Sequence, residues 1–314
     1  QPIRVVASIE ALAGIVREVG GGRVTVETLI PEGVEPHEFQ ATPEIVASVT
    51  GADLLVGLGH FPFEDQVVEA TGVLSVGIEQ YERTGLRLSP WPGELGYATR
   101  GPHLLAGNRH GYWLKPINGL AIARSVVGKL IELDPAGEPT YMNLLSSFED
   151  EVAALEAYFV ILSRERGLSG LPVAVAFPAE AYVAEAFGMD VVASLAIGEN
   201  VFIGGGELIE LEDALRGGEI AFILASELSK RMTVGRFAQQ LAADTGTPMV
   251  FVRTTTLEGL RDYGALLMYN AGVLSVNREV SERGGTEPVV FLIAIIVLAA
   301  VVVLETGLLL RVRT

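Results

Sequence analysis

The sequence contains no cysteine among its 314 residues. Disulfides, thiolate metal sites and cysteine nucleophiles are therefore excluded, and any metal ion must bind through histidine, carboxylate or carbonyl groups. Basic residues are also scarce, since 22 Lys and Arg face 39 Asp and Glu, for a formal charge of -17. This charge repels phosphate backbones and no basic stripe offsets it, so nucleic acid is not an expected partner.

Enzyme motifs are missing as well. The chain has no Gly-x-Ser-x-Gly elbow, no Walker phosphate loop and no His-Glu-x-x-His helix. The glycine run at residues 204–206 lacks the strand-turn-helix context of a dinucleotide-binding fold. We therefore expect a protein that is not an enzyme.

One long apolar run lies near the C-terminus. Every residue from Val289 to Leu304 is apolar, and the run resumes from Gly307 to Leu310. About 20 such residues cross ~30 Å of hydrocarbon as a helix, so we predict a transmembrane anchor in contact with lipid. Arg311 and Arg313 follow, which favours a cytoplasmic C-terminus with the preceding chain outside the cell. No signal-peptide pattern opens the sequence, and a removed signal peptide would explain this.

The rest of the chain alternates short Val/Ile/Leu runs with amphipathic stretches, a pattern typical of βαβ units. Its length and 49% hydrophobic content suffice for two domains. Strand candidates lie at 3–8, 24–29, 54–58 and 73–76 in the first half, and at 173–177, 190–194, 220–225 and 249–253 in the second. The sequence therefore predicts an α/β fold with two doubly wound parallel-sheet lobes.

A different pattern occupies residues 138–166, where no strand signal occurs. Apolar residues recur there at three- and four-residue spacing, as Leu145, Phe148, Val152, Leu155, Phe159 and Leu162. This spacing predicts one long amphipathic helix that joins the lobes and allows a modest domain movement. The predicted organisation is an N-terminal lobe at 1–137, a connecting helix at 138–167, a C-terminal lobe at 168–285, and a membrane anchor with a short tail at 286–314.

Residues that directly follow the strands are the first candidates for a binding site, because open parallel sheets bind ligands beyond the carboxyl ends of their strands. His37 follows the 24–29 strand in a loop that Pro31 and Pro36 stiffen. A neutral imidazole on a rigid loop is a suitable ligand for zinc, manganese and similar ions. His60 follows the 54–58 strand and Glu227 follows the 220–225 strand.

Several motifs carry a family resemblance. They are Val5-Val6-Ala7-Ser8-Ile9, Pro36-His37-x-Phe39-x-x-Thr42-Pro43, Ala52-Asp53-Leu54-Leu55-Val56, Trp113-Leu114-Lys115-Pro116 and Tyr182-Val183-Ala184-Glu185-Ala186-Phe187-Gly188. Together they resemble the zinc and manganese group of ABC-importer solute-binding proteins, over almost all of residues 3–275. The resemblance implies two lobes and one connecting helix around a metal that is cargo and not a resident cofactor. It also implies the permease subunit of an ABC importer as partner.

The resemblance implies four metal ligands, of which the first lobe matches two. His37 matches the first family histidine directly. His110 corresponds to the second, although it precedes Trp113 by three residues where the family motif has two. We expect the imidazole of His110 to reach the cleft in spite of this one-residue insertion.

The two remaining family ligands are absent. The third position, a His or Glu five residues before Tyr182, is Phe177 in this chain. The fourth, a carboxylate after the last strand, falls near Thr255 or Thr256. Neither phenyl nor hydroxyl is a comparable ligand.

Three other residues are candidates to complete the metal shell. His60 is either a ligand or a surface residue in the turn before Phe61. Glu180, three residues beyond the third family position, is either a ligand or a solvated carboxylate at a helix N-terminus. Glu227 is the candidate carboxylate at the strand edge of the second lobe.

We therefore predict an extracellular, membrane-anchored solute-binding protein that captures zinc or manganese and delivers it to an ABC importer. The two missing ligands leave two alternatives open. One is a protein of the same fold that binds a small non-metal solute, and the other is a surface adhesin without a transport role.

Overall fold

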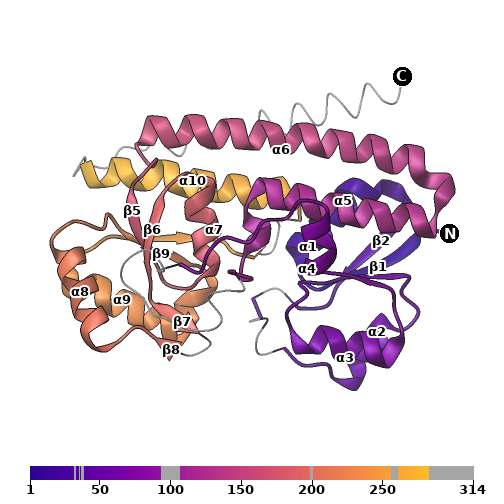
Figure 1. Ribbon diagram of the computed structural model, residues 1–314, viewed down its shortest axis with the longest axis horizontal. Coiled ribbons are helices and arrows are strands. Elements are labelled where there is room, and N and C mark those ends of the chain that lie inside the picture. Colours follow the sequence, from indigo (N-terminus) through magenta and orange to yellow (C-terminus); the bar gives the residue numbers. More distant parts are fainter. Residues whose placement is uncertain are drawn as a thin grey trace.

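The computed structural model describes residues 1–31, 33–34, 36, 39–92, 107–198, 201–255 and 261–282. These residues form two α/β lobes that lie side by side, and long helices bridge the lobes along one edge (Figure 1). We call the part before the longest helix the first lobe and the part after it the second lobe. The predicted α/β architecture with two parallel sheets is confirmed.

The first lobe is built on a four-stranded parallel sheet with the order β2-β1-β3-β4. Its strands are β1 (Ile3–Ala7), β2 (Val24–Thr28), β3 (Leu54–Val56) and β4 (Ser75–Val76). All three residues of β3 and four of the five in β1 are buried, as expected for central strands that helices cover on both faces. The predicted strands all occur, with ends one to two residues shorter.

The second lobe has a parallel sheet of the same kind, with the order β10-β9-β5-β6. Its strands are β5 (Pro172–Val175), β6 (Asp190–Ser194), β9 (Ile223–Ser226) and β10 (Met249–Val252). A small antiparallel hairpin, β7 (Ala196–Gly198) and β8 (Val201–Phe202), lies outside the sheet. The sequence patterns predicted the four sheet strands but not this hairpin.

Helices cover both sheets. In the first lobe they are α1 (Glu10–Gly20), α2 (Pro43–Val49), α3 (Pro62–Thr71), α4 (Ile78–Arg83) and α5 (Pro116–Leu133), with short η1 (Gly21–Arg23), η4 (Tyr112–Leu114) and η5 (Pro135–Gly137). In the second lobe they are α7 (Ala179–Ala186), α8 (Gly205–Arg216), η6 (Leu228–Arg231) and α9 (Thr233–Thr245). Helix α2 begins with Thr42 as N-cap, whose side chain accepts from the backbone N–H of Ile45, and Pro43 lies in the first turn.

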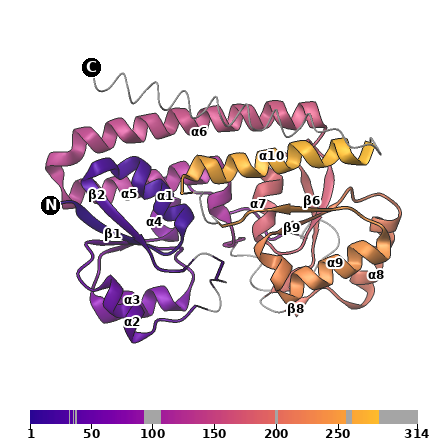
Figure 2. The same cartoon turned by 180° about the vertical axis from the view of Figure 1, so that it is seen from behind.

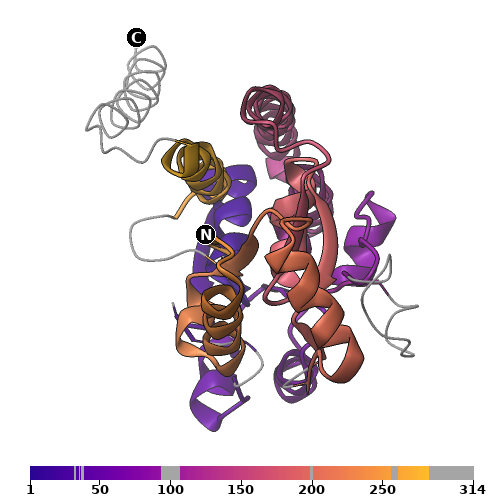
Figure 3. The same ribbon diagram turned by 90° about the vertical axis from the view of Figure 1, so that its left-hand side faces the viewer.

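The connecting helix α6 (Glu138–Arg166) is 29 residues long and begins and ends where the apolar spacing placed it. The apolar residues that recur along it are buried: Leu145, Phe148, Val152, Leu155, Phe159 and Leu162. Helix α10 (Tyr263–Glu282) runs beside it on the same edge of the molecule (Figures 1 to 3). Because α10 packs on α6, on α1 and on β10, it is a second element that links the lobes.

The predicted membrane anchor lies outside the described residues. Among the helices that are described, none combines the length and apolar character needed to span a bilayer.

Candidate functional site between the lobes

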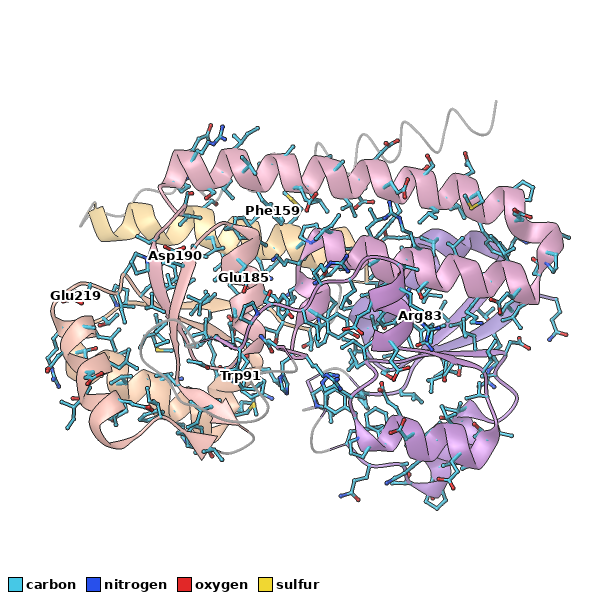
Figure 4. All side chains as sticks on the ribbon, viewed as in Figure 1. Arg83, Trp91, Phe159, Glu185, Asp190 and Glu219 are labelled. Atoms are coloured by element: carbon cyan, nitrogen blue, oxygen red, sulfur yellow. The ribbon has the colours of Figure 1, made fainter. Side chains whose placement is uncertain are left out.

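A cavity of about 50 Å³ lies where the carboxyl ends of the two sheets face each other. The first lobe contributes His60 and His110 to its wall, and the second lobe contributes Phe177 and Glu180. Three of the predicted ligands are thus brought to one place. An open hollow of about 890 Å³ shares both histidines and continues outward past Trp91. Trp91 lies in the zone where the lobes meet (Figure 4).

His60 is presented by a tight turn between β3 and α3. Gly59 has a φ of +73°, and a Cβ there would lie 2.5 Å from the backbone nitrogen of Ile78, so no other residue fits. The buried carboxylate of Glu64 accepts hydrogen bonds from the backbone N–H groups of Leu58 and Gly59, both at 2.6 Å. Burial raises the pKa of Glu64, and these hydrogen bonds act against the rise.

The imidazole of His60 is oriented by the same turn. Its Nδ1 lies 3.3 Å from the carbonyl oxygen of Leu58, which also accepts a hydrogen bond from the Tyr112 hydroxyl at 3.0 Å. When Nδ1 carries the proton, Nε2 carries the lone pair with which imidazole binds a metal. The His60 and His110 rings meet edge to face with centroids 5.5 Å apart.

His110 is carried on a segment of the first lobe that is bound to the second lobe. Its backbone N–H donates to Oδ1 of Asn108 at 3.0 Å. Asn108 in turn donates to the carbonyl of Pro178 at 2.8 Å and accepts a hydrogen bond from the Tyr182 hydroxyl. Gly111 completes the segment, because a Cβ there would lie 2.7 Å from the Ala179 carbonyl oxygen. The backbone before and after the imidazole of His110 is therefore fixed against α7.

Aromatic rings enclose the imidazole of His110. The ring of Trp91 lies 5.6 Å and that of Phe177 lies 5.3 Å from it, centroid to centroid, both nearly perpendicular. Phe177 occupies the position where the family resemblance implies a metal ligand. At this position the second lobe thus contributes an apolar wall.

Glu180 is the polar group that the second lobe presents to the cavity. The residue is fully buried, and its Oε2 accepts a hydrogen bond from the backbone N–H of Phe177 at 2.8 Å. Its Oε1 has no hydrogen-bond partner of normal geometry within the described part of the chain, although Ser226 lies close enough to lower the pKa. Burial outweighs these polar neighbours and raises the pKa of Glu180 to about 7. The carboxyl group is therefore not a solvated one.

The two lobes use the same four-residue pattern after equivalent strands. Phe61-Pro62-Phe63-Glu64 follows β3, and Phe177-Pro178-Ala179-Glu180 follows β5. In both, the Glu N–H donates to the Phe carbonyl, and the Glu carboxylate accepts from backbone N–H groups of its own turn. Because β3 and β5 each lie between two parallel neighbours, the two turns occupy equivalent places in their sheets.

The remaining candidates lie elsewhere. Glu227 is half-buried and forms an ion pair with Lys230 at 2.5 Å, and it lines neither hollow. Thr255 lines the cavity, whereas Thr256 and His37 lie outside the described residues. Over the described ranges, no group of three or more His, Asp or Glu side chains is arranged so that it could hold a metal ion.

Hydrogen bonds join the lobes around the cavity. The Trp113 indole donates to the Thr254 carbonyl at 2.9 Å, and Lys115 pairs with Glu185 at 3.0 Å. Glu185 lies between the lobes in Figure 4. These contacts fix the first-lobe segment after His110 to the second lobe.

Sequence reasoning missed two residues that build the site, Glu64 and Asn108. The repeated Phe-Pro-x-Glu pattern was a visible signal for Glu64, since it recurs after a strand in each half. Asn108 had no comparable signal, because its partners, Pro178 directly before α7 and Tyr182 within it, lie 70 and 74 residues away in the chain.

Comparison with known proteins shows similarity to metal-binding components of importers. The family model of ZnuA, zinc-uptake complex component A periplasmic, matches residues 5–276. The metal ABC transporter substrate-binding lipoprotein ScbA of Streptococcus cristatus is 24% identical over 160 residues, which cover 49% of each protein. The chain thus spans about half the length of the curated relatives that it matches.

Solved structures show the same fold over most of the chain. A zinc-bound ZnuA deletion mutant superposes with a TM-score of 0.70 at 19% identity, covering 92% of this chain and 100% of the other. The laminin-binding protein Lmb of Streptococcus agalactiae, described as an adhesin with metal-transporting activity, has a TM-score of 0.67 at 18% identity. That match covers 89% of this chain and 99% of the other.

Proposed function

Because the chain belongs to the ZnuA family of zinc-uptake components, we propose that it captures a divalent transition metal outside the cytoplasm and delivers it to the permease of an ABC importer. Zinc and manganese are the proposed cargo. A component of this kind binds and releases a solute without converting it, so the family assignment confirms that the protein is not an enzyme.

The observation that carries this proposal is the convergence of His60, His110 and Glu180 on one cavity. A water molecule needs roughly 10–15 Å³ of such space, so about 50 Å³ accommodates an ion with a few waters. Pockets for organic ligands are typically ~300–1,000 Å³. The enclosed cavity therefore suits an ion, whereas an organic solute would have to bind in the open hollow of about 890 Å³ beside it.

In the proposed site, His60 and His110 bind the metal through ring nitrogens, and His37 joins them from the first lobe. Glu180 is the proposed carboxylate from the second lobe. Water completes the shell, which makes the site open and exchangeable, in contrast to a closed structural zinc site with four protein ligands. Imidazole ligands favour zinc, and the added carboxylate makes manganese compatible.

Metal analysis of protein purified without chelator tests the proposal. We expect close to one equivalent of zinc or manganese per chain, lost on dialysis against a chelator and regained on addition of the metal. Protein that contains no metal and binds neither ion in titration would contradict the proposed function, whatever its fold.

We further propose that residues 286–314 anchor the protein as a single membrane-spanning helix with both lobes outside the cell. Gly284 and Gly285 supply a short tether between the second lobe and the span. External protease should remove the lobes from intact cells, and alkaline washing should leave the full-length protein in the membrane fraction. Protected lobes, or release by alkali, would exclude the anchor without affecting the metal site.

A further inference from the structure

We propose that Glu64 is the residue that positions His60 for metal binding. Its carboxylate does not touch the metal but fixes the Leu58-Gly59 turn from which the imidazole projects. This inference rests on the proposed function, because it assumes that the cavity binds a metal through His60.

The contacts of Glu64 are concentrated on this one turn. The residue is 5% exposed, and both carboxylate oxygens are used: Oε1 accepts from Leu58 N–H and Oε2 from Gly59 N–H. The hydroxyl of Ser8, directly after β1, also donates to Oε1. Glu64 therefore joins the ends of two adjacent strands to the first turn of α3.

The peptide group between Leu58 and Gly59 connects Glu64 to His60. Its N–H, that of Gly59, donates to the carboxylate, and its carbonyl oxygen, that of Leu58, faces Nδ1 of His60 at 3.3 Å. If the peptide rotates, the carbonyl leaves Nδ1 and the preference for the Nδ1–H tautomer is lost. The tautomer matters because it decides which ring nitrogen has the lone pair for the metal.

The second lobe provides a comparison for this arrangement. Glu180 stands at the same place in the repeated turn, but Ala176 takes the place of His60 before the phenylalanine. There the carboxylate accepts from the backbone N–H of Phe177, the residue after Ala176, and Ser226 also lies against it. Where the turn carries an imidazole, the carboxylate instead accepts from the two N–H groups that precede the imidazole in the chain, those of Leu58 and Gly59. This difference points to orientation of the side chain and not merely to capping of the helix.

A double-mutant cycle separates positioning from general stability. We expect Glu64→Gln to weaken zinc binding about tenfold, within the range seen for residues that orient metal ligands. Glutamine keeps the shape but cannot accept from both N–H groups. In the His60→Ala background the same substitution should have no further effect on zinc affinity, because its target is gone.

Ser163→Ala is the matched control. The Ser163 hydroxyl is buried and donates to the carbonyl of Phe187, away from the cavity. This variant should lower the melting temperature without changing zinc affinity. If Glu64→Gln does not fold, Ser8→Ala replaces it, because this change removes one donor to the same carboxylate. It should weaken zinc binding less than Glu64→Gln, and it should have no effect in the His60→Ala background.

The tautomer of His60 in the metal-free protein gives a readout that does not depend on zinc. With four histidines in the chain, their side-chain nitrogen signals can be resolved by NMR. Wild type should show His60 with the proton on Nδ1, and Glu64→Gln should shift it toward a mixture of tautomers. The inference is overturned if the tautomer and the affinity are unchanged, or if the loss of affinity persists in His60→Ala. If wild type binds no metal at all, the proposed function fails, and the tautomer still reports whether Glu64 orients His60.

Discussion

The two lobes make the same turn after equivalent strands and use it for different purposes. In the first lobe the turn presents His60, and both oxygens of Glu64 are bound within the scaffold. In the second lobe no ligand precedes the phenylalanine, and Glu180 keeps one oxygen without a hydrogen bond of normal geometry in the described part of the chain. One carboxylate therefore supports a ligand, whereas the other is available to act as one.

This difference indicates how the lobes divide the work. The first lobe supplies imidazoles on rigid turns, and the second supplies the Phe177 wall and one buried carboxyl group. A ligand shifts a conformational equilibrium only through contacts that differ between the states. With most ligands on one side, we expect metal binding to draw the lobes together less than in relatives with ligands on both sides. The hydrogen bonds that already join the lobes also limit their movement.

The largest expected effect sharpens the contrast between the two carboxyl groups. The pKa of Glu180 is about 7 when folded against a usual value of 4.5, so the folded state binds more protons between these values. Stability from this group is full below pH ~4.5 and is lost as pH rises through about 7, by up to about 3 kcal/mol. Glu180→Gln should remove that decline from the metal-free protein.

Urea unfolding at pH 5 and pH 8, in the presence of chelator, measures this effect. Other buried carboxyl groups also make the free energy of unfolding depend on pH. The change in this free energy between pH 5 and pH 8 is therefore compared between wild type and variant. Equal changes with pH in both proteins would show that Glu180 is not buried as a carboxyl group.

Removal of a first-lobe imidazole is the next largest effect. His110→Ala should weaken zinc binding about a hundredfold, or roughly 2.7 kcal/mol, because it removes a ligand. Unfolding of the metal-free protein measures separately the cost of removing a ring that packs against Trp91 and Phe177. Arg109→Ala, a change in the exposed neighbour, is the control for local disturbance. Calorimetric titration with zinc measures both, and equal affinities for the two variants would remove His110 from the site.

Phe177→His would break the asymmetry between the lobes. The phenyl ring already contacts the His110 ring, so an imidazole at the same position reaches the cavity. We expect zinc to bind about tenfold more tightly, equivalent to ~1.4 kcal/mol. Phe177→Leu, which removes the ring without adding a ligand, should not tighten binding. If the histidine variant binds no better than the leucine variant, the metal does not lie near Phe177.

The smallest effect is expected at Glu227. Its carboxylate is held by Lys230, so Glu227→Gln should change metal affinity by less than about twofold. His60→Ala, measured in parallel, should cause a clear loss. If Glu227→Gln weakens metal binding instead, a site that bridges the lobes through η6 is favoured. If neither substitution weakens metal binding, both residues are excluded as ligands.

The sequence predicted the fold well because the fold is encoded in local periodicity. Alternating apolar runs located the sheet strands, and the three-to-four spacing located α6 to the residue. The same reasoning missed the packing of α10 along α6, because an amphipathic helix does not specify which lobe it covers.

The site was less predictable because it depends on contacts distant in sequence. His60 was a candidate because it follows the 54–58 strand, and its side chain lines the cavity. The burial of Glu180 was not visible, since a carboxylate in a first helical turn is ordinarily solvated, and here Phe177 and Ser226 enclose it. The role of Lys230 in holding Glu227 was also hidden, because strand-edge position alone does not give the direction of a side chain.

Anomalous diffraction at the zinc absorption edge, from crystals grown with zinc, locates the bound metal. We predict one strong peak in the cavity between the lobes, about 2.0–2.1 Å from a ring nitrogen of both His60 and His110. A peak bound by neither histidine, or no peak in the cavity of a protein that contains zinc, would contradict it.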